Sequence, residues 1–186
     1  AGFMSTQVAM HADCPVVVVG AAPPDGIVRH GVVVGVDGSA VSDQALCYAF
    51  EQASSRRTGL EIVHAWWSTV PAGLTNELRL GQVAEERLAV SESVVGWSER
   101  FSDVTVRQHL PLGPAVFALV ETAKYAELLV VGSRGQGRLR AVLLGSVSHG
   151  VLQHATCPVA VVRQASAVDT HREMVSTSAG STGFAT

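Results

Sequence analysis

The chain has 186 residues and a formal net charge of −3, with 47% hydrophobic and 16% charged residues. This length suits one domain with residues to spare, and the composition excludes wholesale disorder. The charge excludes a basic surface for nucleic acid, and no run reaches the ~20 apolar residues of a membrane helix. The three cysteines form no C-x-x-C pair, so we expect a cytoplasmic protein without a disulfide framework.

The beginning of the chain repeats a segment near its end. Residues 2–19 align without a gap with residues 145–162, at an offset of 143 residues, and both contain H-A-x-C-P-V. Residues 1–20 are therefore expected to be a remnant of a preceding repeat, a helix end followed by a strand. We expect this remnant to dock on the edge of the last strand, in cis or in trans, or to stay disordered.

A turn-rich linker at residues 21–30 precedes a regular alternation of strands and helices up to residue 164. Short β-branched runs predict strands at residues 32–36, 60–66, 104–110, 127–131 and 158–163. Apolar stripes predict helices at residues 39–57, 82–101, 114–125 and 146–155, with Gly59 ending the first helix and a loop at residues 68–80.

This alternation predicts an α/β domain at residues 31–164, followed by a disordered tail at residues 165–186. We expect a doubly wound, five-stranded parallel sheet of order 3-2-1-4-5, with helices on both faces. Such sheets bind ligands at the carboxyl ends of their strands, where the strand order reverses.

Candidate ligand-binding groups lie at two of these strand ends. Asp37 follows the first strand, and a glycine-rich loop at residues 132–145 follows the fourth and leads into a helix. Glycines let backbone N–H groups approach an anion, and a helix N-terminus offers unpaired donors. The alternative is structural: the glycines make turns, and Asp37 or Ser39 caps the first helix.

Three motifs in this order resemble the universal stress protein family, specifically its ATP-binding branch. They are V-G-V-D-G-S after the first strand, G-x2-G-x9-G-S after the fourth, and H-A-x-C-P-V before the fifth. The resemblance covers roughly residues 27–164, which form the complete copy of the repeat. Together with the partial copy at residues 1–20, it implies the C-terminal domain of a tandem protein whose first copy is truncated. It implies that Asp37 contacts adenine, and that Gly35, Val63 and Ala65 line the base. The same resemblance implies that ribose and phosphates are held by Gly132, Arg134, Gly135, Gly137, Arg138, Gly145, Ser146, Val147 and Ser148.

The resemblance also implies a homodimer through the last strand, which runs from Pro158 to Val162. We expect an ATP-binding, nucleotide-responsive regulator of the stress response, with or without Mg²⁺, and at most slow ATP hydrolysis. One alternative is a slow ATPase or nucleotide-dependent transferase of the same fold. Another is a dimerising interaction protein that binds no nucleotide. No residue is assigned a catalytic role, and no histidine spacing suggests a metal site.

Overall fold

The computed structural model describes residues 7–9, 11–12, 14–20, 28–69, 76–135 and 144–163. Its strands are β1 (Val16–Val18), β2 (Val32–Gly35), β3 (Leu60–Val63), β4 (Val106–His109), β5 (Leu128–Gly132) and β6 (Val159–Val162). Its helices are α2 (Ala40–Arg56), α3 (Asn76–Arg100), α4 (Ala115–Thr122) and α5 (Ser146–His154). The expected tail at residues 165–186 lies outside the described residues.

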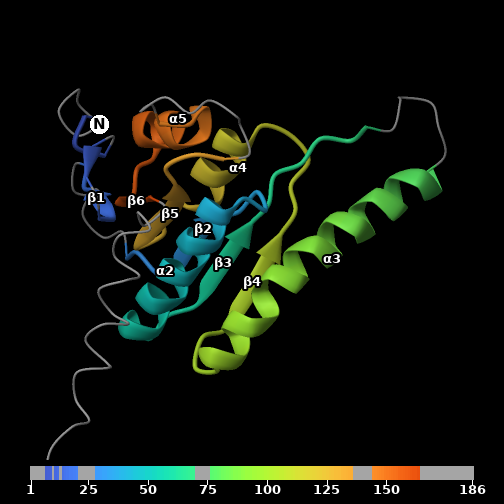
Figure 1. The fold of residues 1–186 in the computed structure, drawn as a ribbon, viewed down its shortest axis with the longest axis horizontal. Helices are drawn as coiled ribbons and strands as arrows, with labels where there is room; N and C mark the ends of the chain where they lie inside the picture. Colours follow the sequence, from blue (N-terminus) through green and yellow to red (C-terminus); the bar gives the residue numbers. More distant parts are fainter. Residues whose placement is uncertain are drawn as a thin grey trace, which may run out of the picture.

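The described strands form one sheet in the order β1-β6-β5-β2-β3-β4. The prediction of a mostly parallel α/β sheet is confirmed, because β4, β3, β2, β5 and β6 pair in parallel with their neighbours. The predicted five-stranded count and its order are wrong for the whole sheet. A sixth strand, β1, pairs antiparallel with β6 and forms the outer edge (Figure 1).

Both faces of the sheet are covered, which explains the unbroken β-branched runs in the central strands. On β2, Val32 and Val34 belong to the core cluster that contains α2 and α3 residues, while Val33 belongs to the cluster that contains α4 and α5 residues. All three side chains are at most 2% exposed. Figure 1 shows α4 and α5 on one side of the sheet and α2 on the other, and α3 residues belong to the same core cluster as those of α2. Buried parallel strands of this kind need no polar face.

Helix α2 begins and ends with local signals. Ser39 is its N-cap, and the Ser39 hydroxyl accepts a hydrogen bond from the backbone N–H of Ser42 at 3.2 Å. The helix does not end at Gly59 as predicted. Arg57 takes the left-handed conformation, with φ 54°, and its N–H donates to the last carbonyls of the helix. A non-glycine residue therefore takes the position that glycine usually occupies.

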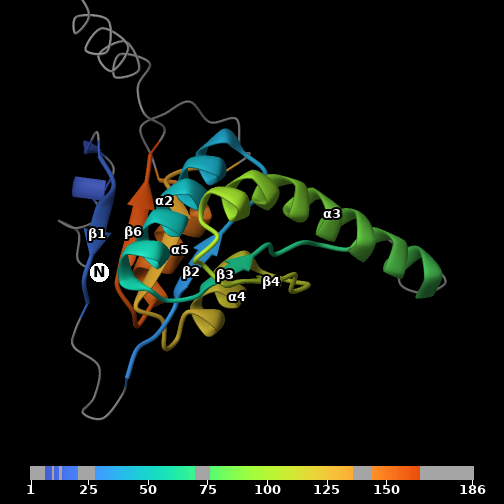
Figure 2. The same cartoon turned by 90° about the horizontal axis from the view of Figure 1, so that it is seen from below.

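Helix α3 is the main error in the predicted boundaries. It begins at Asn76, inside the expected loop, and it extends away from the sheet at its N-terminal end (Figures 1 and 2). Its C-terminal half holds it to the domain, where Val90 and Val94 are buried. Phe101, just beyond the helix, stacks on Phe50 of α2 with ring centroids 5.7 Å apart. Among the described residues, no helix is long and apolar enough to cross a membrane.

The N-terminal segment docks in cis, so the first of the two expectations for it holds. Residues 7–9 and 11 are helical, and β1 follows them and lies beside β6 (Figure 2). The Arg163 guanidinium donates to the carbonyl of Ala12 at 3.4 Å. The predicted homodimer through residues 158–162 requires this edge of the sheet to be free. In the structure β1 of the same chain occupies it.

Candidate functional site

A cavity of about 550 Å³ lies at the carboxyl ends of β2 and β5. The chain moves outward on one side of β2 through β3 and β4, and on the other side through β5 and β6. The strand order therefore reverses between β2 and β5. The cavity occupies the place where doubly wound sheets bind their ligands, and its volume suits a small molecule.

The residues around this cavity include every predicted site residue that the structure describes. Gly137 and Arg138 lie outside the described residues. The predicted residues in its wall are Gly35, Asp37, Val63, Ala65, Gly132, Arg134, Gly135, Gly145, Ser146, Val147 and Ser148. The sequence reasoning missed the other lining residues, Val36, Ser42, Ala115, Leu119, Val131 and Leu144.

A tight turn holds the Asp37 carboxylate just beyond the carboxyl end of β2. Its Oδ1 accepts a hydrogen bond from the N–H of Ser39 at 3.0 Å, and Gly38 between them has a φ of 76°. Ser39 in turn caps α2. Both readings of this segment are therefore compatible, since Ser39 is the helix cap while Asp37 faces the cavity.

Gly135 approaches Asp37 so closely that no side chain fits there. A Cβ added to Gly135 would collide with Oδ2 of Asp37. The end of β2 and the loop after β5 thus meet across the cavity. The backbone of Gly135 remains open toward the cavity because it carries no side chain, as a loop that contacts an anion requires.

The N-terminus of α5 forms a second part of the wall. Gly145 is its N-cap, and no side chain caps the helix. The first N–H groups of a helix have no partner within the helix and carry a partial positive charge. Ser146 and Val147 belong to this first turn, and half-buried Arg134 adds a full positive charge to the same cavity. This end of the cavity suits an anion.

The Ser148 hydroxyl serves the structure of this wall. It is buried, and it lies within hydrogen-bond distance of the carbonyls of Ser133, at 3.1 Å, and Gly145, at 2.9 Å. The Gly145 N–H also donates to the Ser133 carbonyl at 2.8 Å. The hydroxyl therefore fixes the start of α5 against the end of β5, and Ser148 is also one of the lining residues.

The opposite end of the cavity is apolar. Val63 and Leu119 are 1% and 3% exposed, and Ala65 and Ala115 complete this part of the wall. A Cβ on Gly35 would come within 3.0 Å of a Leu119 methyl group, so glycine lets α4 pack on the end of β2. An apolar end opposite an anion-binding end suits a ligand with a flat apolar base and a charged chain.

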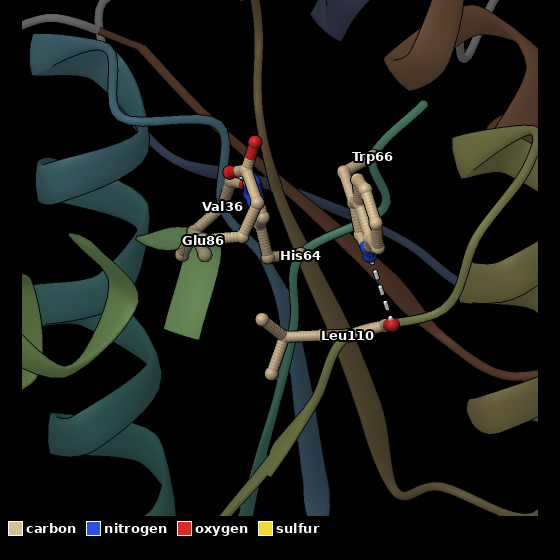
Figure 3. A network of polar contacts seen from close by, with 5 residues as sticks. All are labelled: Val36, His64, Trp66, Glu86 and Leu110. Atoms are coloured by element: carbon tan, nitrogen blue, oxygen red, sulfur yellow. Dashed lines mark hydrogen bonds and ion pairs between the residues drawn. The ribbon is translucent and has the colours of Figure 1, made fainter. Parts of the chain in front are cut away.

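His64 lies between Val36, which lines the cavity, and Glu86 of α3 (Figure 3). Its Nδ1 lies 2.9 Å from the carbonyl of Val36, and its Nε2 lies 3.0 Å from a carboxylate oxygen of Glu86 on α3. The contact with Val36 fixes the orientation of the ring, because a carbonyl only accepts and Nδ1 is the donor to it. His64 thus links a lining residue to the projecting helix.

The tryptophans at the end of β3 do not face the cavity. Trp66 is 7% exposed, and its Nε1 donates to the carbonyl of Leu110 at 3.2 Å (Figure 3). Trp67 is exposed, and neither residue lines the cavity. Trp66 therefore anchors the chain after β3 and is not part of the cavity wall.

The described residues contain few groups for covalent or metal chemistry. Burial raises the pKa of the Cys157 thiol, and burial followed by the nearby Glu51 carboxylate raises the pKa of Cys47. A raised pKa keeps a thiol protonated and unreactive. Among the described residues, no group of three or more His, Cys, Asp or Glu side chains could hold a metal ion.

The fold is that of a doubly wound α/β domain with a cavity at its switch point. The sequence pattern of the universal stress protein family matches residues 29–163. The chain therefore belongs to this family.

Its relatives extend the comparison. Universal stress protein Rv2005c of Mycobacterium tuberculosis is 41% identical over 168 residues, which cover 88% of this chain and 56% of that protein. A universal stress protein of Mycolicibacterium smegmatis is 40% identical over 168 residues, which cover 87% and 55% of the two chains. The chain thus spans about half the length of the curated relatives it matches.

Solved structures show the same fold. A universal stress protein from Archaeoglobus fulgidus superposes with a TM-score of 0.59 at 26% identity, covering 86% of this chain and 53% of that one. A universal stress protein in complex with cAMP superposes with a TM-score of 0.53 at 28% identity, covering 75% of this chain and 99% of that one.

Proposed function

We propose that the cavity binds an adenine nucleotide, ATP above all, and that the domain is a nucleotide-responsive regulator in the stress response. The observation that carries this proposal is the convergence of the two sequence motifs on one cavity. Asp37 and Gly135, 98 positions apart in the sequence, form adjacent parts of its wall. Membership of the universal stress protein family supports the stress-response part of the proposal.

The shape and chemistry of the cavity fit such a ligand. The apolar end by Val63 and Leu119 takes the base, and the Asp37 carboxylate accepts from its amino group. The uncapped N-terminus of α5, with Arg134 nearby, takes the phosphates. The glycine at position 135 leaves space that a side chain would fill. Within the described residues the cavity offers one carboxylate and no metal cluster, so we propose binding with at most slow hydrolysis.

A second candidate ligand is cAMP. The solved universal stress protein in complex with cAMP is 28% identical to this chain. The same apolar end would take its adenine, and the same helix N-terminus its single phosphate. ATP and cAMP therefore differ in the number of phosphates that the helix N-terminus would hold, and competition between them measures which of the two the cavity binds more tightly.

The relation to longer proteins is a further part of the proposal. We propose that the complete domain is the C-terminal unit of a tandem arrangement. The internal repeat at an offset of 143 residues supports this reading, as do relatives of about twice the matched length.

Equilibrium binding of labelled ATP tests the site. We expect Gly135→Glu to weaken ATP binding at least tenfold, about 1.4 kcal/mol, because the new carboxylate collides with Asp37 and repels phosphate. Gly96→Glu is the matched control, since a Cβ at Gly96 on α3 meets nothing within 4 Å. Equal ATP affinity in the wild type and Gly135→Glu would remove the site assignment.

Two further measurements separate the alternatives. An ATPase would show Mg²⁺-dependent turnover that fails when Asp37 or Ser146 is replaced. A protein that binds no nucleotide would carry no ATP, ADP or cAMP in native mass spectra of freshly purified material, and it would not bind labelled ATP.

A further inference from the structure

Helix α3 carries a second apolar face, which the described part of the chain leaves exposed. Its first face is covered: Val90 and Val94 belong to the core cluster that contains α2 residues, and Trp97 packs against that cluster. The second face includes Leu88 and Val95, whose side chains are 60% and 56% exposed. A surface helix of a folded domain usually has a single apolar stripe, which it turns to the core. The second stripe of α3 therefore serves no packing within this domain.

The exposed residues have the spacing of a coiled-coil seam. Positions that alternate three and four residues apart lie along one side of a helix, where a partner helix can pack on them. On α3 these positions hold small or apolar residues, and we call the set the α3 seam: Gly81, Ala84, Leu88, Ser91, Val95 and Ser98. Its small members leave holes that larger side chains of a partner helix can fill.

A column of carboxylates runs along the solvent side of the α3 seam. Glu85, Glu92 and Glu99 recur at intervals of one heptad, so each flanks the seam at the same relative position, and all three are exposed. No described residue forms an ion pair with any of them. Glu86, in contrast, contacts His64 at 3.0 Å. The glutamate that faces the domain is thus paired, and the outward column is not.

The N-terminal half of α3 leaves the seam accessible. Figures 1 and 2 both show this half extending beyond the sheet, with no other labelled element beside its end. Farther along the helix, the Ser91 hydroxyl donates to the Gln108 side chain of the edge strand β4 at 3.3 Å. Most helices depend on tertiary packing for their stability, and the projecting turns lack it in the single domain. A second helix can lie along α3 at this edge of the described sheet and supply that packing.

We infer that the α3 seam is a docking surface for an amphipathic partner helix with basic residues beside its apolar stripe. The apolar stripe packs on Leu88 and Val95, and lysine or arginine side chains pair with the column of glutamates. The unpaired carboxylates beside an exposed apolar stripe specify the charge of this partner. The inference concerns α3 alone and does not depend on nucleotide binding.

A second copy of α3 fits this surface less well than a basic helix. In an antiparallel pair of α3 helices, the two columns of glutamates would face each other and repel. In a parallel pair, each glutamate column would face the positions on the other side of the seam, which hold Leu80, Arg87 and Val94. Only Arg87 among them is basic, and Val94 is buried in the domain.

The test measures the binding of two designed peptides to the full chain by fluorescence anisotropy. Both peptides are three-heptad helices with leucine at the seam positions, and the flanking positions hold lysine in one and glutamate in the other. Flanking charges of a single sign also keep each peptide from pairing with itself. We expect the wild type to bind the lysine peptide about tenfold more tightly than the glutamate peptide. The preference should shrink as added salt screens the charges.

Charge reversal distinguishes docking on the seam from a general attraction between opposite net charges. E85K/E92K should remove the preference for the lysine peptide, because the column beside the seam becomes mostly basic. D43K/E121K is the matched control, since it makes the same change in net charge at exposed acids of α2 and α4. This control should keep the preference of the wild type.

The apolar part of the contact has its own pair of variants. Leu88→Gln should weaken binding of the lysine peptide about tenfold, because a leucine of the seam no longer packs on the peptide. Leu112→Gln changes a leucine away from α3 whose side chain is 58% exposed, against 60% for Leu88. It should bind the lysine peptide like the wild type.

Three outcomes would overturn the inference. Equal affinity of the wild type for the two peptides, or no binding of either, would show that the seam does not select a basic helix. An equal loss of preference in E85K/E92K and D43K/E121K would reduce the effect to net charge. A wild type that sediments as a dimer, and that Leu88→Gln converts to a monomer, would show that a second copy occupies the seam.

Discussion

Asp37 and Gly135 are far apart in the sequence, yet they form adjacent parts of one cavity wall. Asp37 is placed by its own turn, because its carboxylate accepts from the N–H of Ser39. Gly135 is placed by the loop after β5, and only the lack of a Cβ allows the two to approach. The sequence motifs predicted both residues because each of these two positions requires one particular type of residue.

Other residues of the site carry no such local signal. Leu119 and Ala115 reach the cavity because α4 packs over the end of β2, and a leucine in an apolar helix looks the same whether it faces a core or a ligand. The contact between His64 and Glu86 joins residues 22 positions apart on different elements. Such contacts depend on tertiary packing, and no spacing rule predicts them.

The His64–Glu86 contact gives a prediction at this scale. Their side chains are 16% and 33% exposed, so solvent weakens the contact, and we expect Glu86→Ala to lower the free energy of unfolding by about 0.5–1 kcal/mol. Glu85→Ala is the matched control, because Glu85 is an exposed neighbour on the same helix and the change in helix propensity is identical. Urea unfolding measures both variants, and an equal effect of the two would show that the contact contributes nothing.

At the scale of elements, the strands were easier to predict than the helices. The buried runs of β2, β5 and β6 are apolar because helices cover both faces, so their hydrophobicity alone places them. The start of α3 was misplaced because residues Asn76 to Gly81 show no apolar periodicity of their own and end in glycine, a weak helix former. Arg57 ended α2 where glycine was expected, since a left-handed arginine has no sequence signature.

Two helical glycines test how closely the elements pack. A Cβ on Gly150 of α5 would come within 2.8 Å of Val116 of α4, whereas a Cβ on Gly96 of α3 meets nothing within 4 Å. We expect Gly96→Ala to raise the free energy of unfolding by about 0.5–1 kcal/mol through helix propensity. We expect Gly150→Ala to lose that gain and to destabilise, because α4 must move or Val116 must change rotamer. Urea unfolding again gives the comparison, and equal stabilisation by the two changes would mean that α4 yields without cost.

At the scale of the molecule, the site exists only when most of the domain is assembled. Its lining comes from β2, β3 and β5, from α2, α4 and α5, and from the segments between them. The order of the parallel strands could be predicted because crossover connections between parallel strands are right-handed. This order brings β2 beside β5. The sequence left open whether β1 docks on the last strand or stays disordered. A repeat shows that two segments are similar, but it does not show whether one binds beside the other in the same chain.

This dispersal of the lining predicts that ligand binding and global unfolding are coupled. A ligand that binds only the folded state adds RT ln(1 + [L]/Kd) to the free energy of unfolding, about 2.7 kcal/mol at a hundred times Kd. We expect ATP at that excess to raise the free energy of unfolding of the wild type, measured with urea, by this amount. The transition should remain a single step, because the cavity is lined by several elements and none of them holds it alone. Gly135→Glu, which we expect to bind at least tenfold more weakly, should gain about 1.4 kcal/mol or less at the same ATP concentration, while Gly96→Glu should gain as much as the wild type. A biphasic transition, in which ATP moves only one phase, would mean that part of the domain unfolds without opening the cavity. The site would then belong to a smaller cooperative unit than the sheet as a whole.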